Sequence, residues 1–210
     1  MGELEAVVEA IRAELTGRSA AREQALALAR ETIRTSANAI RAIHRHELAK
    51  ARAMADEAGQ AIHRAVELLA DHPDVLHAGF VHDAAKEFVE ARVVLALVQG
   101  EPPPTPDELD VRGVTYLHGL AESVGELRRH LLDYLRRDEV ERCEPLLERM
   151  DEVYALLVTI DFPDALTAGL RRSTDAVRGI LEKTRGDLTV ALRQRGLETR
   201  MAELEAKLAR

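Results

Sequence analysis

Apolar residues recur at helical spacing along nearly the whole chain, and no stretch shows the period-two alternation of a half-buried strand. We expect a break near Thr16 and Gly17 and a bend at Gly186 or Gly196, because glycine weakens a helix. Gly100 should end the third helical region. The pattern predicts an all-α bundle of about six or seven helices in a single domain over residues 1–210, with helical regions at roughly 4–50, 51–70, 74–99, 115–137, 138–159 and 165–210.

One segment lacks the helical pattern. Residues 100–113 read GEPPPTPDELDVRG, and their prolines predict an extended, stiff linker. The segment is too short and too isolated to indicate a boundary between two domains.

The third and fourth helical regions each carry two glutamates on one helical face. Glu87 and Glu90 are three residues apart, and Glu122 and Glu126 are four apart. On the fourth region the two acids lie roughly opposite a stripe of apolar residues, namely Leu117, Leu120, Val124, Leu127, Leu131 and Leu135.

The third region is apolar nearly all round, which predicts burial on more than one side and a contact surface in an assembly larger than a dimer. Glu87 and Glu90 should therefore border buried surface, where an uncompensated carboxylate is costly. The compensating group is a cation, an arginine or a proton.

Four convergent carboxylates suit Mg²⁺ or Mn²⁺ rather than zinc. The alternative is a solvated face on which the acids pair with Lys86, Arg92 or Arg129. A di-iron bundle requires Glu-x-x-His on two helices, and none of the four glutamates has a histidine three residues on. The His82-Asp83 dipeptide, common in phosphohydrolases, is interpreted as a chance match.

Composition limits the remaining classes of function. The formal net charge is −8, yet local basic clusters leave nucleic-acid binding open. These clusters are Arg41, His44 and Arg45, then Arg128 and Arg129. The single cysteine suits a reducing, cytoplasmic location. The N-terminus does not read as a signal peptide, and the longest apolar run, 93–98, is too short to span a membrane.

Residues Tyr116 to Arg129 read YLHGLAESVGELRR. This segment is similar to the pattern YLLG-x-AD-x-x-GEL-x-R and is the most specific of several that resemble the translin superfamily. Residues 86–91, KEFVEA, resemble the family segment QEYVEA. Weaker similarities in the same order extend the resemblance over roughly residues 22–192.

The family has two branches, and the acids resemble those of the translin-associated factor X branch. That resemblance implies a metal-dependent endoribonuclease in which Glu87, Glu90, Glu122 and Glu126 bind Mg²⁺ or Mn²⁺ and catalyse cleavage. Glu122 stands where the branch has Asp, so one ligand is longer by a methylene. The resemblance further implies a closed homo-oligomeric shell, with an octamer as the expected form, that encloses single-stranded RNA.

The basic residues complete the expected site. Arg129 shares a helical face with the acids and should hold a phosphate, with Arg128, Arg41, His44 and Arg45 as further backbone contacts. The alternative from the other branch is a shell that binds single-stranded RNA or DNA without cutting it. A di-iron oxidoreductase is the third reading.

Overall fold

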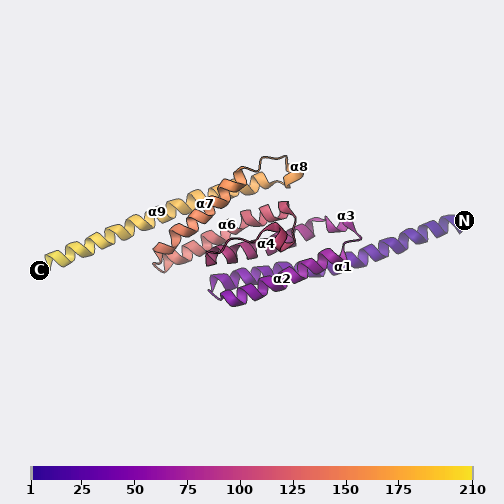
Figure 1. The fold of residues 1–210 in the computed structure, drawn as a ribbon, viewed down its shortest axis with the longest axis horizontal. Helices are drawn as coiled ribbons and strands as arrows, with labels where there is room; N and C mark the ends of the chain where they lie inside the picture. Colours follow the sequence, from indigo (N-terminus) through magenta and orange to yellow (C-terminus); the bar gives the residue numbers. More distant parts are fainter. Residues whose placement is uncertain (1, 210) are drawn as a thin grey trace. The chain divides into compact units, whose positions relative to one another are not determined.

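The computed structural model describes residues 2–209, and within that range it contains helices and no strand. The predicted all-α fold is confirmed. Six helices have sixteen residues or more, which agrees with the predicted six or seven. They are α1 (Gly2–His44), α2 (Leu48–Leu68), α4 (Gly79–Gln99), α6 (Gly113–Arg136), α7 (Cys143–Val158) and α9 (Leu170–Leu208), as Figure 1 shows.

Four short elements occupy the connections: α3 (Pro73–Leu76), α5 (Pro106–Leu109), the 3₁₀ turn η1 (Val140–Arg142) and α8 (Asp164–Thr167). The third predicted region is thus divided into α3 and α4, and the last into α8 and α9. The proline-rich linker is also not wholly extended. Thr105 caps α5 there by accepting a hydrogen bond from the Glu108 amide, and the Glu108 carboxylate bonds back to the Thr105 amide.

The predicted break near Gly17 is wrong, and neither Gly186 nor Gly196 ends the last long helix. Gly17 lies inside α1, and Gly186 and Gly196 lie inside α9. A glycine costs a helix about 1 kcal/mol, which the good helix formers on either side offset. Gly100 does end α4, with a φ of 74° that a glycine adopts without strain. The predicted end of the last helix, residue 210, lies outside the described residues.

The chain forms two compact units, one made of residues up to 96 with 102–119 and the other of residues 97–101 with 120–210. In the first unit α1 and α2 pack side by side (Figure 1). Their contact is rich in fully buried alanines, including Ala25, Ala42, Ala58 and Ala65. Small side chains allow two helix backbones to approach closely.

A glycine on α2 brings α4 into the same core. A Cβ at Gly59 would lie 3.0 Å from the Phe88 ring, so the ring packs directly over the α2 backbone. Ala91 of α4 joins a buried cluster with Ala39, Ile40 and Ala55. These contacts fix the face that α4 turns toward α1 and α2.

The second unit is built on long aliphatic side chains. Leu127, Leu131, Met150 and Leu188 are fully buried. The predicted leucine stripe of α6 is therefore a core face, although burial on this helix also takes in polar residues such as His130. The Arg185 guanidinium of α9 donates to both carboxylate oxygens of Asp151 on α7, at 2.6 and 2.7 Å.

The apolar residues that surround α4 are buried within the chain and are not exposed for assembly. Val89, Val93 and Val94 are fully buried and Leu95 and Leu97 nearly so. The prediction that this helix is buried on more than one side is confirmed. Because the chain itself covers these residues, however, they do not form a surface for assembly, and that part of the interpretation is wrong.

No helix among residues 2–209 combines the length and the apolarity needed to cross a membrane.

Candidate metal centre

The four predicted acids lie on two long helices, in the middle of α4 and of α6. Glu87 and Glu90 occupy adjacent turns of α4, and Glu122 and Glu126 occupy adjacent turns of α6. Within each pair the spacing keeps both side chains on one side of the helix. Whether the pairs meet depends on how α4 and α6 cross.

Gly119 determines that crossing. A Cβ at Gly119 would lie 2.6 Å from Val89 Cγ1 and 2.8 Å from the Lys86 carbonyl oxygen, closer than side chains tolerate. Only glycine permits the α6 backbone to rest on α4 at this point. The sequence carried this signal in the segment YLHG, but the pattern of apolar residues does not predict a helix crossing from it.

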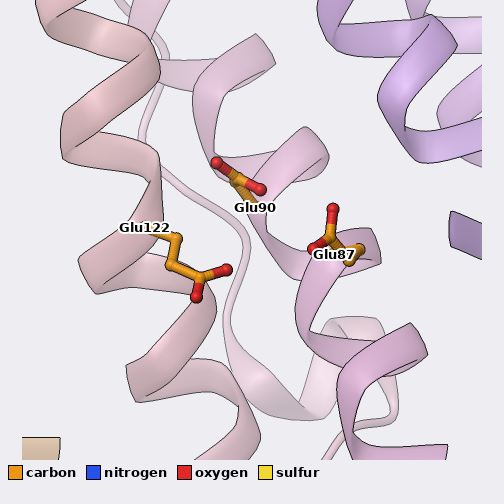
Figure 2. Close-up of side chains that lie close together, drawn as sticks. All are labelled: Glu87, Glu90 and Glu122. Carbon is orange, nitrogen blue, oxygen red and sulfur yellow. The ribbon is translucent and has the colours of Figure 1, made fainter. Parts of the chain in front are cut away.

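The acids surround this close approach. Val89 stands between Glu87 and Glu90 in the chain, and Glu122 follows Gly119 by three residues on the same continuous helix. Glu87, Glu90 and Glu122 each offer a carboxylate oxygen, and these three oxygens lie within 4.8 Å of one another. Figure 2 shows the three side chains, two from α4 and one from α6.

Burial strengthens the mutual repulsion of these carboxylates. Glu90 is 8% exposed, and Glu87 and Glu122 are half-buried. The group contains only oxygen donors, which are the ligands of a hard divalent cation such as Mg²⁺ or Mn²⁺. The three carboxylates therefore fit such an ion by chemistry and by spacing.

Glu126 is placed differently from the other three. It is half-buried on α6, and its Oε2 atom lies 3.7 Å from Nη1 of Arg129. Among residues 2–209 the convergent group comprises Glu87, Glu90 and Glu122 and does not include Glu126. The structure thus brings three of the four predicted ligands together and sets the fourth one turn further along α6.

The basic candidates divide into exposed and structural residues. Arg129 has a side chain that is 59% exposed, and it stands near the acids through Glu126. Arg128 points instead toward α9, where it donates to Asp187 Oδ2 at 2.7 Å and to Thr184 Oγ1 at 2.9 Å. Its side chain is only 16% exposed. Arg128 is therefore a packing residue, not a surface available to phosphate.

The candidates at the end of α1 also differ from one another. Arg41 is exposed and donates to Asn38 Oδ1, and Arg45 is exposed and paired with Glu47. His44 is 8% exposed, so it offers little surface to a nucleic acid. Of these three residues, the two arginines stay candidates for phosphate contacts.

Two histidines lie close to each other on α4 and α6. The rings of His82 and His118 meet edge to face at 5.5 Å, and His82 Nδ1 lies 2.9 Å from Thr115 Oγ1. Burial lowers the pKa of His82, and the neighbouring His118 ring lowers it further. The two rings form a packed pair. Within residues 2–209 the convergent group of possible ligands includes no histidine, which weakens the di-iron reading.

The protein is therefore an all-helical bundle with a group of carboxylates where two long helices cross. No model of a known protein family matches the chain. The uncharacterized protein MJ0175 of Methanocaldococcus jannaschii is 30% identical over 197 residues, which cover 93% of this chain and 87% of that protein.

Solved structures with a similar fold identify the family. AfC3PO in complex with duplex RNA has a TM-score of 0.84 and 32% identity, covering 90% of this chain and 97% of that one. AfC3PO alone has a TM-score of 0.83 at 32% identity, covering 90% and 98%. Apo-NeC3PO, at 19% identity and a TM-score of 0.80 over 88% and 96%, shares the fold. The chain belongs to the translin superfamily, the family of these C3PO proteins.

Proposed function

We propose that the protein is a metal-dependent endoribonuclease that cleaves single-stranded RNA inside a closed homo-oligomeric shell. The observation that carries the proposal is the group of three carboxylate oxygens within 4.8 Å, from Glu87, Glu90 and Glu122. Three carboxylates from two helices that each offer an oxygen to one place provide the donor type that a hard divalent cation binds.

Glu87, Glu90 and Glu122 are the residues that hold the cation, and Glu126 stands one turn further along α6. A bound Mg²⁺ or Mn²⁺ supplies Lewis acidity, which makes water a better nucleophile and offsets charge on the phosphoryl group. Glu122 reaches further than the aspartate that the related branch has at this position. The Glu122 side chain is half-buried, and its carboxylate belongs to the convergent group despite the additional methylene.

Exposed arginines position the RNA backbone. Arg129 is the nearest candidate to the acids, and its distance of 3.7 Å from Glu126 leaves it able to turn toward a phosphate. Arg41 and Arg45 offer further contacts at the end of α1. Contacts of this kind read the backbone and not the bases, so binding depends on salt and little on sequence. The similarity to AfC3PO, solved with duplex RNA, supports RNA as the ligand class.

Assembly is supported by apolar residues that the chain leaves uncovered. On α1, Leu4, Val8, Ile11 and Leu15 recur at helical spacing and are 71%, 45%, 51% and 52% exposed. On α9, Leu197, Met201, Leu204 and Leu208 do the same at 59%, 54%, 57% and 79%. Apolar rows of this length mark contact surfaces. Further copies of the chain cover them in the homo-oligomer, for which we expect an octamer.

The test is RNA cleavage with matched variants. We expect the purified protein to cut a labelled single-stranded RNA with Mn²⁺ or Mg²⁺ and to stop when the metal is chelated. Glu90→Gln should abolish cleavage and leave RNA binding intact. Glu57→Gln is the control, since Glu57 is exposed on α2 and does not belong to the convergent group. Cleavage that survives both the chelator and Glu90→Gln would overturn the proposal.

The second candidate is a shell that binds RNA without cutting it. The similarity to AfC3PO, which was solved in complex with duplex RNA, favours this function, because such a complex is evidence of binding. The same assay separates the two functions. Tight binding with no metal-dependent products, on single-stranded and duplex RNA alike, would establish the binding function alone.

A further inference from the structure

A cavity of about 340 Å³ lies within the first unit, away from the acids. Its walls come from α2, from the turn after α3, from the first turns of α4 and from the segment that leads into α6. Most of the lining is aliphatic, with Ile62, Val66, Val81 and Val111 among its members. Close-packed proteins leave few voids larger than a water molecule. Sites for small ligands measure about 300–1,000 Å³, so this cavity has room for one small molecule.

The polar residues of the lining are His63, His77, His82, Asp110, Arg112 and Thr115. Two of the imidazole rings are held by contacts that fix their orientation. His63 Nε2 lies 2.9 Å from the Leu109 carbonyl oxygen. A carbonyl only accepts, so Nε2 donates and fixes the ring. His82 is fixed by its contact with Thr115 Oγ1 at 2.9 Å. Both rings also stand edge-on to a neighbour, His63 to Phe88 and His82 to His118. The ligand thus meets rigid, flat and weakly polar surfaces beside aliphatic ones, which suits an aromatic ring.

Arg112 supplies charge at the mouth of the cavity. It lines the cavity and is exposed, and its guanidinium makes no hydrogen bond or ion pair within the part of the chain that the structure describes. A guanidinium in that position prefers a carboxylate, which it binds through two parallel N–H···O bonds. Burial lowers the pKa of His82, which disfavours the charged form of this ring in the wall.

We propose that this cavity binds a small aromatic carboxylate, with the ring among Ile62, Val81 and the two imidazoles and the carboxylate on Arg112. The site is distinct from the carboxylate group on α4 and α6, and none of its lining residues belongs to that group. Its occupant differs in chemistry from RNA, since more than half of the lining residues are aliphatic and the charged ones are one arginine, Arg112, and one acid, Asp110.

The experiment is calorimetric titration of the full chain with indole-3-acetate as the probe and with its neutral analogue indole-3-ethanol. We expect saturable binding of one indole-3-acetate per chain and weaker binding of the alcohol. Arg112→Gln should weaken the acid about tenfold, the loss of a charged hydrogen-bonded contact, and should leave the alcohol unchanged. Arg64→Gln is the control, because Arg64 is exposed on α2 outside the cavity.

A second variant tests the cavity itself. Ala85 lines it and is half-buried, so Ala85→Leu should fill the space and abolish binding of both probes while thermal unfolding stays cooperative. If that variant does not fold, the comparison of Arg112→Gln with Arg64→Gln is sufficient to test the proposed carboxylate contact. No saturable binding at millimolar indole-3-acetate, equal losses in the two arginine variants, or preferred binding of nucleoside monophosphates would overturn the proposal. RNA cleavage is not a readout here, so this result stands apart from the proposed nuclease activity.

Discussion

Gly119 is the residue on which the geometry of the carboxylate group depends. It allows the α6 backbone to touch Val89 and the Lys86 carbonyl, and thereby sets Glu122 beside Glu87 and Glu90. The pairing of acids on each helix could be predicted, because spacings of three and four share a face. Their convergence could not, because the helix crossing depends on a missing Cβ rather than on a repeating pattern.

A matched pair of glycines on α6 tests this role. Gly119→Ala should destabilise the fold by about 1–3 kcal/mol, as overpacking does, because its Cβ would lie 2.6 Å from Val89. Gly125→Ala has nothing within 4 Å of its Cβ, and should be neutral or stabilise by up to about 1 kcal/mol. Urea unfolding measures both free energies. Equal effects of the two substitutions would contradict the close approach.

Substitution of the neighbouring arginines Arg128 and Arg129 on α6 should affect different properties, namely stability for Arg128 and RNA binding for Arg129. Arg128→Ala loses its contacts with Asp187 and Thr184 and should lower the free energy of unfolding by about 1–3 kcal/mol. Arg129→Ala should leave stability within about 0.5 kcal/mol, weaken RNA binding across sequences, and reduce its salt dependence by about one phosphate contact. Unfolding curves and RNA titrations at several salt concentrations measure these effects. An unchanged salt slope for Arg129→Ala would make it a structural partner of Glu126.

At the scale of elements, helical periodicity predicted the ends of the long helices to within six residues and missed the short helices. The pattern over 74–99 is continuous, yet the chain breaks between α3 and α4, and the signal that ends α8 is a pair of left-handed residues at 168 and 169. Ala168 has a φ of 52°, which no local preference of alanine predicts. Short helices of four residues depend on their caps and on packing, and carry too little periodicity to be recognised.

Cys143, the first residue of α7, should be chemically inert in the folded protein. It is fully buried, with Sγ 3.7 Å from the Leu131 carbonyl. Burial, with smaller contributions from Glu144, Glu139 and Glu141, raises its pKa to about 11. The thiol is therefore protonated at pH 8, and Ellman's reagent should react slowly with the native chain and fully after unfolding in guanidinium. Rapid labelling of the native protein would contradict this placement.

At the scale of the whole molecule, the proposed shell requires partners for the apolar rows on α1 and α9. We expect light scattering to report a homo-oligomer larger than a dimer. Leu204→Glu should reduce the mass, because it places a charge in the middle of the α9 row. Thr199→Glu, on the other side of the same helix and exposed, is the control and should leave the mass unchanged. A monomer at micromolar concentration would rule out the enclosing shell.

The location of the bound cation tests the central claim most directly. Crystals grown with Mn²⁺ should show an anomalous difference peak at the manganese edge, in contact with carboxylate oxygens of Glu87, Glu90 and Glu122. Crystals of the Glu90→Gln variant grown in the same way should show this peak greatly weakened, with the helices in place. The absence of a peak at this position at millimolar Mn²⁺, or a peak that persists unchanged in the variant, would contradict the account.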